Sequence, residues 1–134
     1  MLSRAALMNL AEQHYFIGCN NHDLKTVLAT MSQDCTMRFS AAKYQYVGGD
    51  AMRSHFSDFF SNFPDINFHD FVSIVDVEQQ AIASHFTVAL IDNAGKTLTM
   101  HNSNFFKANK DGIFDDVLIF NAAPLKEGFE AGSL

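Results

Sequence analysis

Two short turn sequences between apolar runs constrain the fold of this chain more than any other feature. They are residues 92–95, Asp-Asn-Ala-Gly, and residues 109–112, Asn-Lys-Asp-Gly. An Asx residue first and a glycine last are typical of a type I turn in which the glycine takes the left-handed conformation of a three-residue hairpin loop. The two turns therefore predict three consecutive antiparallel strands with a defined register.

Pairing outward from both turns assigns each side chain to one face of the sheet. The predicted inner face is apolar and contains Phe86, Val88, Leu90, Leu98, Met100, Phe106, Phe114, Leu118 and Phe120. Four polar residues interrupt it, namely Ser84, Asn102, Asn104 and Asp116. The same register predicts that His85, His101 and Ser103 lie on the outer face. The polar residues of the inner face are therefore the candidate site.

Composition limits the class of protein. A length of 134 residues suits one domain with a single core, and 48% hydrophobic with 18% charged residues is typical of a globular chain. The 14 Phe residues, without any Trp, indicate either a thick core or an apolar ligand cavity. A net charge of −6 with only nine Lys and Arg disfavours nucleic acid as a partner.

Cysteines, histidines and the first residues give no sign of a metal, a cofactor or a membrane. Cys19 and Cys35 lack a CxxC spacing, and the histidines form no known ligand motif. Residues 1–10 resemble neither a signal peptide nor a membrane span. We therefore expect reduced cysteines, no metal, no cofactor and a cytoplasmic location.

Apolar periodicity predicts helices before strands. A helix over residues 3–18 would bury the face of Leu7, Leu10, Ala11, His14, Ile17 and Gly18. A short helix follows Asp23, and a third runs from residues 48–50 to Pro64 with His55 beside its apolar stripe. Strands are expected at residues 35–39, 44–47, 66–77, 81–91, 97–108 and 113–121. The class is α+β, one domain over residues 1–123 with a curved antiparallel sheet, followed by a tail at 124–134.

The order of several short motifs resembles the SnoaL-like branch of the nuclear transport factor two-like superfamily. The motifs are Asn21-His22-Asp23-Leu24, the helix from Gly49 to Phe60, Phe63-Pro64-Asp65, and Asn104-Phe105-Phe106-Lys107 before Asp111-Gly112. The resemblance covers nearly the whole chain and implies a cone-shaped sheet around a long helix, a pocket, and often a homodimer through the outer sheet face. It does not imply one activity, because this fold carries isomerases, dehydratases, cyclases and non-catalytic modules.

Comparison with the ketosteroid isomerase pattern of that superfamily gives a partial match. Tyr15 falls where the pattern has its oxyanion-stabilising Tyr, and Asn104 falls where it has a protonated Asp. Phe39 occupies the position of the general-base Asp. Because a Phe cannot accept a proton, the resemblance does not extend to steroid isomerisation by that mechanism.

The catalytic hypothesis from the sequence uses Asp116 and His55 as base and acid. On the inner face Asp116 would lie beside Phe106, where an apolar environment raises the pKa of a carboxyl group. If the bulge expected beside the second hairpin turn lay one residue away, Asp116 would instead face outward. His55 could face the pocket or lie at its rim, and Tyr15 could be an oxyanion donor or a packing residue.

We therefore expect a pocket for a small, largely apolar molecule that carries a carbonyl or hydroxyl group. If it catalyses, the reaction is a cofactor-free isomerisation, dehydration or cyclisation; the alternative is a non-catalytic ligand-binding or dimerisation module. The predicted ligand-binding residues are Asn102, Asn104, Ser84, Phe39, Phe59, Phe86, Val88, Phe106 and Leu118. For the outer face we expect exposed Val75, Phe105, Val117 and Ile119, and a homodimer contact.

Overall fold

The protein is described by a computed structural model that covers residues 1–39 and 44–121. The helical segments are α1 (Arg4–Asn9), the π-helix η1 (Leu10–Phe16), α2 (Ile17–Asn20), α3 (Leu24–Ala29) and α4 (Gly49–Asn62). The strands are β1 (Met31–Phe39), β2 (Tyr44–Val47), β3 (Asp65–Asp76), β4 (Ala81–Ile91), β5 (Thr97–Ala108) and β6 (Phe114–Asn121). The predicted α+β class is confirmed, and most predicted strands agree within one residue; β1 begins four residues earlier than expected. The predicted tail lies outside the described residues.

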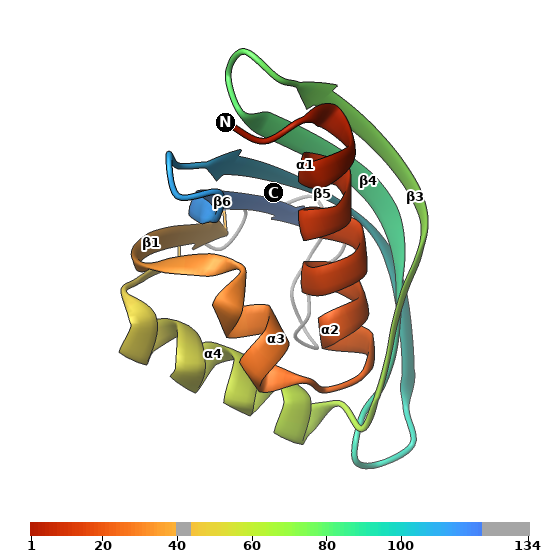
Figure 1. The fold of residues 1–134 in the computed structure, drawn as a ribbon. Coiled ribbons are helices and arrows are strands. Elements are labelled where there is room, and N and C mark those ends of the chain that lie inside the picture. The colour runs from red at the N-terminus through yellow and green to blue at the C-terminus, as the bar shows by residue number, and fades with distance from the viewer. Residues whose placement is uncertain (40–43, 122–134) are drawn as a thin grey trace.

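One curved sheet in the order β2-β1-β6-β5-β4-β3 forms the body of the molecule. Neighbouring strands are antiparallel except β1 and β6, which are parallel, so the sheet is mixed and not wholly antiparallel as expected. Figure 1 shows the long N-terminal helix lying inside the curve of β3, β4 and β5, with α3 and α4 beside it. No helix in the described part of the chain is long and apolar enough to cross a membrane.

Both predicted hairpin turns are present. Gly95 and Gly112 have φ angles of 82° and 77°, the left-handed conformation that favours glycine. In the first turn the Asp92 carboxylate accepts hydrogen bonds from the backbone N–H groups of Ala94 and Lys96, both at 2.9 Å. The first turn joins β4 and β5, in which Ser84 lies opposite Asn104 and Phe86 opposite Asn102. These residues therefore share one face of the sheet, as predicted.

The β5–β6 register differs from the prediction because β6 carries a bulge directly after its first residue. Ala108 pairs with Phe114, but the preceding residue Lys107 pairs with Asp116, which leaves Asp115 as the extra residue. The Asp115 carboxylate accepts hydrogen bonds from Ser32 at 2.9 Å and Asn109 at 2.8 Å. Because of the bulge, every later residue of β6 points to the face opposite to the predicted one.

Burial along β6 follows the bulge. Phe114, Val117 and Ile119 are buried, whereas Phe120 is 42% exposed and Leu118 is partly exposed. The predictions that Leu118, Phe120 and Asp116 face inward, and that Val117 and Ile119 face outward, are therefore wrong. A shift of one residue exchanges the two faces because side chains alternate along a strand.

The N-terminal helix contains a π-helical segment that the sequence analysis missed. The backbone N–H of Ile17 donates to the carbonyl of Glu12, five residues earlier. The extra residue in this turn allows the adjacent rings of Tyr15 and Phe16 both to be buried. The buried face is Leu7, Ala11, Tyr15, Phe16, Gly18 and Cys19, so the predicted face was wrong in including His14, which is exposed, and Leu10 and Ile17, which are only partly buried.

Local sequence explains where α3 begins and where α4 begins and ends. Asp23 caps α3, because its carboxylate accepts a hydrogen bond from the backbone N–H of Thr26 at 3.2 Å. Gly48 precedes α4 with a φ of 91° and donates to the Cys35 carbonyl at 3.0 Å. The helix ends at Asn62, two residues before Pro64, as predicted. These junctions place α4 against β1 and β2.

Candidate functional site

A cavity of about 60 Å³ lies between the N-terminal helix, α4 and the concave face of the sheet. Its lining residues are Tyr15, Cys19, Phe39, His55, Phe56, Phe59, Phe68, Phe86, Val88, Leu90, Asn102, Asn104, Ile119 and Asn121. Phenylalanine rings make up much of the wall, and the polar groups come from five elements of the fold: η1, α2, α4, β5 and β6. This cavity is the candidate functional site.

Tyr15 contributes a phenol from the π-helical segment. Its ring makes edge contacts with Phe56 of α4 at 5.9 Å between centroids and with Phe106 of β5 at 5.0 Å. No hydrogen bond joins its hydroxyl to another described residue. Burial, reinforced by Cys19 and Cys35, raises the pKa of Tyr15 well above its usual value, so the hydroxyl stays protonated and can donate.

His55 contributes an imidazole from α4. Its ring lies against three aromatic rings, with centroid distances of 4.4 Å to Tyr46, 5.0 Å to Phe56 and 5.4 Å to Phe39. Burial lowers the pKa of His55 from 6.5 to about 4, and nearby Asp58 opposes this only in part. The imidazole is therefore neutral at pH 7 and offers one donor and one acceptor nitrogen.

Asn102 and Asn104 contribute two carboxamides from β5. They are two residues apart on one strand, so both point to the concave side, and they are only 8% and 3% exposed. Within residues 1–39 and 44–121, neither Oδ1 atom has a hydrogen-bond partner although both are buried. Asn121 lies opposite Asn102 on β6 and also lines the cavity. Three carboxamides and five phenylalanine rings therefore line the same cavity.

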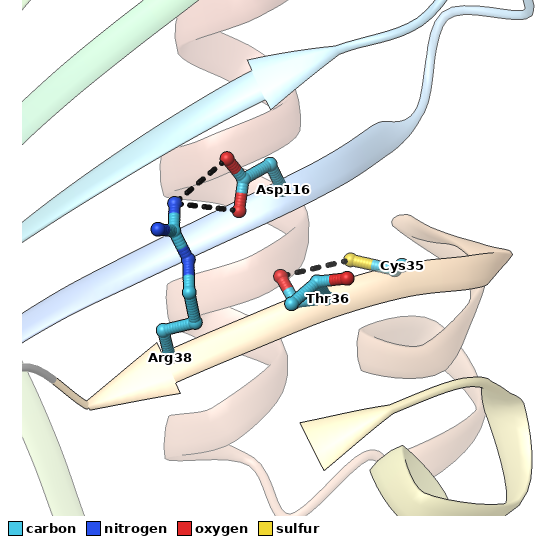
Figure 2. Close-up of polar contacts among 4 residues, drawn as sticks. All are labelled: Cys35, Thr36, Arg38 and Asp116. Carbon is cyan, nitrogen blue, oxygen red and sulfur yellow. Dashed lines mark hydrogen bonds and ion pairs between the residues drawn. The ribbon is translucent and has the colours of Figure 1, made fainter. Parts of the chain in front are cut away.

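Asp116 is not part of this cavity. It lies on the outer face of the sheet, where its carboxylate accepts hydrogen bonds from Arg38 Nη2 at 3.0 and 3.2 Å (Figure 2). The two side chains are 42% and 46% exposed. The predicted pairing of Asp116 with His55 is wrong, and the bulge at Asp115 is the physical reason.

Three other predicted ligand-binding residues lie elsewhere. Ser84 faces inward but its hydroxyl is hydrogen-bonded to Ser73 at 2.8 Å and does not line the cavity. Phe106 is buried behind Tyr15, and Leu118 lies on the outer side of β6. The remaining predicted residues, Phe39, Phe59, Phe86, Val88, Asn102 and Asn104, do line the cavity, as do Tyr15 and His55.

Six lining residues were not among the predicted site residues. They are Cys19, Phe56, Phe68, Leu90, Ile119 and Asn121. Leu90 belongs to the inner sheet face that the sequence predicts, and Phe56 follows His55 on α4. Ile119 and Asn121 could be assigned to the concave face only if the β6 bulge were known. Cys19 lies on the buried face of the N-terminal helix, which the π-helical turn shifts away from the predicted face.

The two cysteines are unpaired thiols, and two of the histidines lie on the outer face of the sheet. Cys19 and Cys35 are free and buried, and burial raises the pKa of both thiols, that of Cys35 to about 12. Cys35 makes a weak contact of 3.9 Å with the Thr36 carbonyl (Figure 2). His85 and His101 lie on the outer face as predicted, with ring centroids 6.1 Å apart. No group of three metal-binding residue types gathers within the described ranges.

Comparison with known families identifies the chain. The model of the SnoaL-like domain matches residues 12–115, which is most of the sequence. This protein belongs to the SnoaL-like family. The matched region contains Tyr15, His55, Asn102 and Asn104, so these cavity residues lie within the SnoaL-like domain itself. No curated protein matches the chain.

Solved structures confirm the fold of this SnoaL-like protein. A candidate polyketide cyclase from Xanthomonas campestris has a TM-score of 0.77 at 19% identity, over 87% of this chain and 90% of the other. The BvnE pinacolase from Penicillium brevicompactum has a TM-score of 0.76 at 17% identity, over 88% of this chain and 86% of the other. A protein of unknown function with a cystatin-like fold from Methylobium petroleophilum has a TM-score of 0.72 at 17% identity, over 96% of this chain and 83% of the other. At these identities the likeness establishes the fold.

Proposed function

We propose that the cavity binds a small, largely apolar molecule that carries a carbonyl or hydroxyl group. The observation that carries this proposal is the pair of buried carboxamides, Asn102 and Asn104, whose Oδ1 atoms have no partner among the described residues. A buried polar atom without a hydrogen bond costs about 1–3 kcal/mol, and a bound hydroxyl group would remove that cost. The Tyr15 hydroxyl would donate to a carbonyl oxygen in the same cavity, and the phenylalanine rings would cover the apolar part of the ligand.

Binding of cyclohexanol, followed by ligand-observed NMR, tests this proposal. The variant Asn104→Leu keeps a similar side-chain shape but cannot form hydrogen bonds, and we expect it to bind cyclohexanol about tenfold more weakly. Ser103→Ala is the matched control, because Ser103 is the neighbouring residue on β5 and faces the outer side. Equal affinity of the Asn104→Leu variant and the unmodified protein would contradict the proposal.

A second candidate function is catalysis of a cofactor-free isomerisation, dehydration or cyclisation. It is favoured by His55, a neutral imidazole in the same cavity as Tyr15 and Asn104. His55 would accept a proton from carbon or oxygen, while Tyr15 or Asn104 would donate to the developing oxyanion. Structural neighbours that carry the names pinacolase and polyketide cyclase are consistent with such chemistry.

Exchange of the α-hydrogens of cyclohexanone for deuterium tests the catalytic candidate, because all three reaction types can share proton removal next to a carbonyl. We expect the unmodified protein to accelerate exchange above the buffer rate and the His55→Gln variant to lose that acceleration. No acceleration by the unmodified protein would favour the alternative of a non-catalytic ligand-binding module.

We further propose that the outer sheet face forms a homodimer contact and that the protein works in the cytoplasm. The support for the dimer is a group of exposed apolar side chains: Val72 at 64%, Ile74 at 72%, Phe105 at 47% and Phe120 at 42% exposure. Of the predicted outer-face residues only Phe105 is among them; Val75, expected there, is partly buried and packs against the core. Light scattering after gel filtration tests it. Phe105→Asp should yield a monomer, whereas Ser57→Asp on the exposed side of α4 should not; a monomeric unmodified protein would contradict the proposal.

A further inference from the structure

The described residues that line the cavity include polar groups but no Lys, Arg, Asp or Glu. The polar groups are the phenol of Tyr15, the thiol of Cys19, the imidazole of His55 and the carboxamides of Asn102, Asn104 and Asn121. Among the described residues, a charged ligand would therefore find hydrogen-bonding groups but no counter-ion in the lining.

Two charged side chains of the described residues, Arg38 and Asp58, do not supply one either. Arg38 lies on the outer face of the sheet and is already paired with Asp116 at 3.0 Å. Asp58 of α4 is exposed, and its charge only partly opposes the effect of burial on His55. The Tyr46 ring packs on the His55 ring with 4.4 Å between the ring centroids.

We propose that the cavity accepts its ligand only in an uncharged form, so that the ligand is a neutral alcohol, ketone or similar compound and not a carboxylate, a phosphate ester or an amine cation. This inference rests on the proposed ligand-binding function and narrows it to one chemical class. Without a counter-ion, a charged ligand would lose its hydration and gain only neutral hydrogen bonds in return.

The titratable groups of the cavity support the inference because both signs of charge are disfavoured there. Burial lowers the pKa of His55 to about 4, which disfavours a cation, and burial raises the pKa of Tyr15, which disfavours an anion. A cavity with a strong negative or positive potential would shift the two pKa values in the same direction. Opposite shifts indicate a desolvated environment that disfavours charge of either sign.

Three compounds with the same ring test the proposal: cyclohexanol, cyclohexanecarboxylate and the cyclohexylammonium ion. Each is titrated at pH 7 while the side-chain amide signals of Asn102 and Asn104 are followed by NMR. We expect saturable shifts with cyclohexanol and at least about tenfold weaker binding of both ions. An ion that binds as tightly as cyclohexanol would overturn the inference and leave the proposed function intact. If cyclohexanol itself does not bind, the proposed function fails and this inference fails with it.

A pH series with the amine provides a second measurement that needs no variant. Between about pH 7 and pH 9 the apparent affinity for cyclohexylamine should rise about tenfold per pH unit, in proportion to its neutral fraction. The affinity for cyclohexanol should stay constant over the same range and serves as the control for changes in the protein. An amine affinity that does not depend on pH would show that the cavity accepts the cation and would overturn the proposal.

Discussion

Arg38 and Asp116 form an ion pair on the outer face of the sheet, with 3.0 Å between Arg38 Nη2 and Asp116 Oδ2. The two residues come from the parallel strands β1 and β6, where Thr36 is the register partner of Asp116. Their side chains are more than two-fifths exposed, so water screens the interaction. The carboxylate is separated from the cavity by the sheet and should not influence a bound ligand.

Replacement of Asp116 by Asn should therefore have little effect. We expect the free energy of unfolding to fall by less than about 1 kcal/mol, because exposed ion pairs contribute little. The affinity for cyclohexanol should change by less than about twofold, since the lost charge is exposed on the opposite face of the sheet. Urea unfolding and NMR titration measure the two quantities. A tenfold loss of affinity would show that Asp116 acts on the cavity after all.

His55 should make stability depend on pH. Its folded-state pKa of about 4 lies below the usual value of 6.5, so between these pH values the unfolded chain binds more protons than the folded protein. The contribution of His55 is present above about pH 6.5 and is lost as the pH falls toward 4, by roughly 3 kcal/mol in total. Urea unfolding at several pH values should show this loss.

The His55→Gln variant isolates this effect, because Gln does not titrate. The difference in unfolding free energy between the unmodified protein and the variant should be constant above about pH 7 and should move in favour of the variant at lower pH. A difference that is independent of pH would mean that the imidazole is more solvated than the structure indicates.

Tyr15 should affect affinity through its hydroxyl group alone. The Tyr15→Phe variant keeps the ring contacts with Phe56 and Phe106, and no described residue loses a hydrogen bond. We expect affinity for cyclohexanone to fall about tenfold, the value of one hydrogen bond of about 1.4 kcal/mol. Methylcyclohexane, which lacks an acceptor, is the control ligand, and its affinity should be unchanged. Equal losses for both ligands would indicate a packing role.

The bulge in β6 predicts which of two adjacent residues supports the core. Val117 is fully buried and Leu118 is partly exposed. Val117→Ala should lower the free energy of unfolding by about 2–3 kcal/mol, and Leu118→Ala by less than about 1 kcal/mol. Thermal or urea unfolding of both variants tests this order. The reverse order would indicate that β6 has a regular register, with Asp116 on the concave face.

The sequence was a reliable guide wherever short-range chemistry fixes the structure. The glycines at positions 95 and 112 define their turns locally, so the β4–β5 register and the inward facing of Asn102 and Asn104 could be predicted. His55 follows from the apolar stripe of α4, which begins after Gly48. The π-helical turn could not be predicted in this way, because it is the packing of Tyr15 and Phe16 against different elements that accommodates it.

The bulge at Asp115 limited the prediction of the site. It is held by a hydrogen bond from Ser32, which is 83 residues away in sequence, and pairing with β1 is irregular at the same place. A local signal was nevertheless present, since two adjacent acidic residues separate Phe114 from Val117. Two apolar residues three apart cannot face the same side of a regular strand, and both are buried here.

The most direct test of the central claim is a high-resolution crystal structure of the protein purified without added ligand. The account predicts electron density for a small molecule in the cavity between Tyr15 and His55, with a polar atom within hydrogen-bonding distance of Asn102 or Asn104. A cavity closed by phenylalanine side chains, with the two carboxamides hydrogen-bonded to each other, would contradict the assignment of this site to ligand binding.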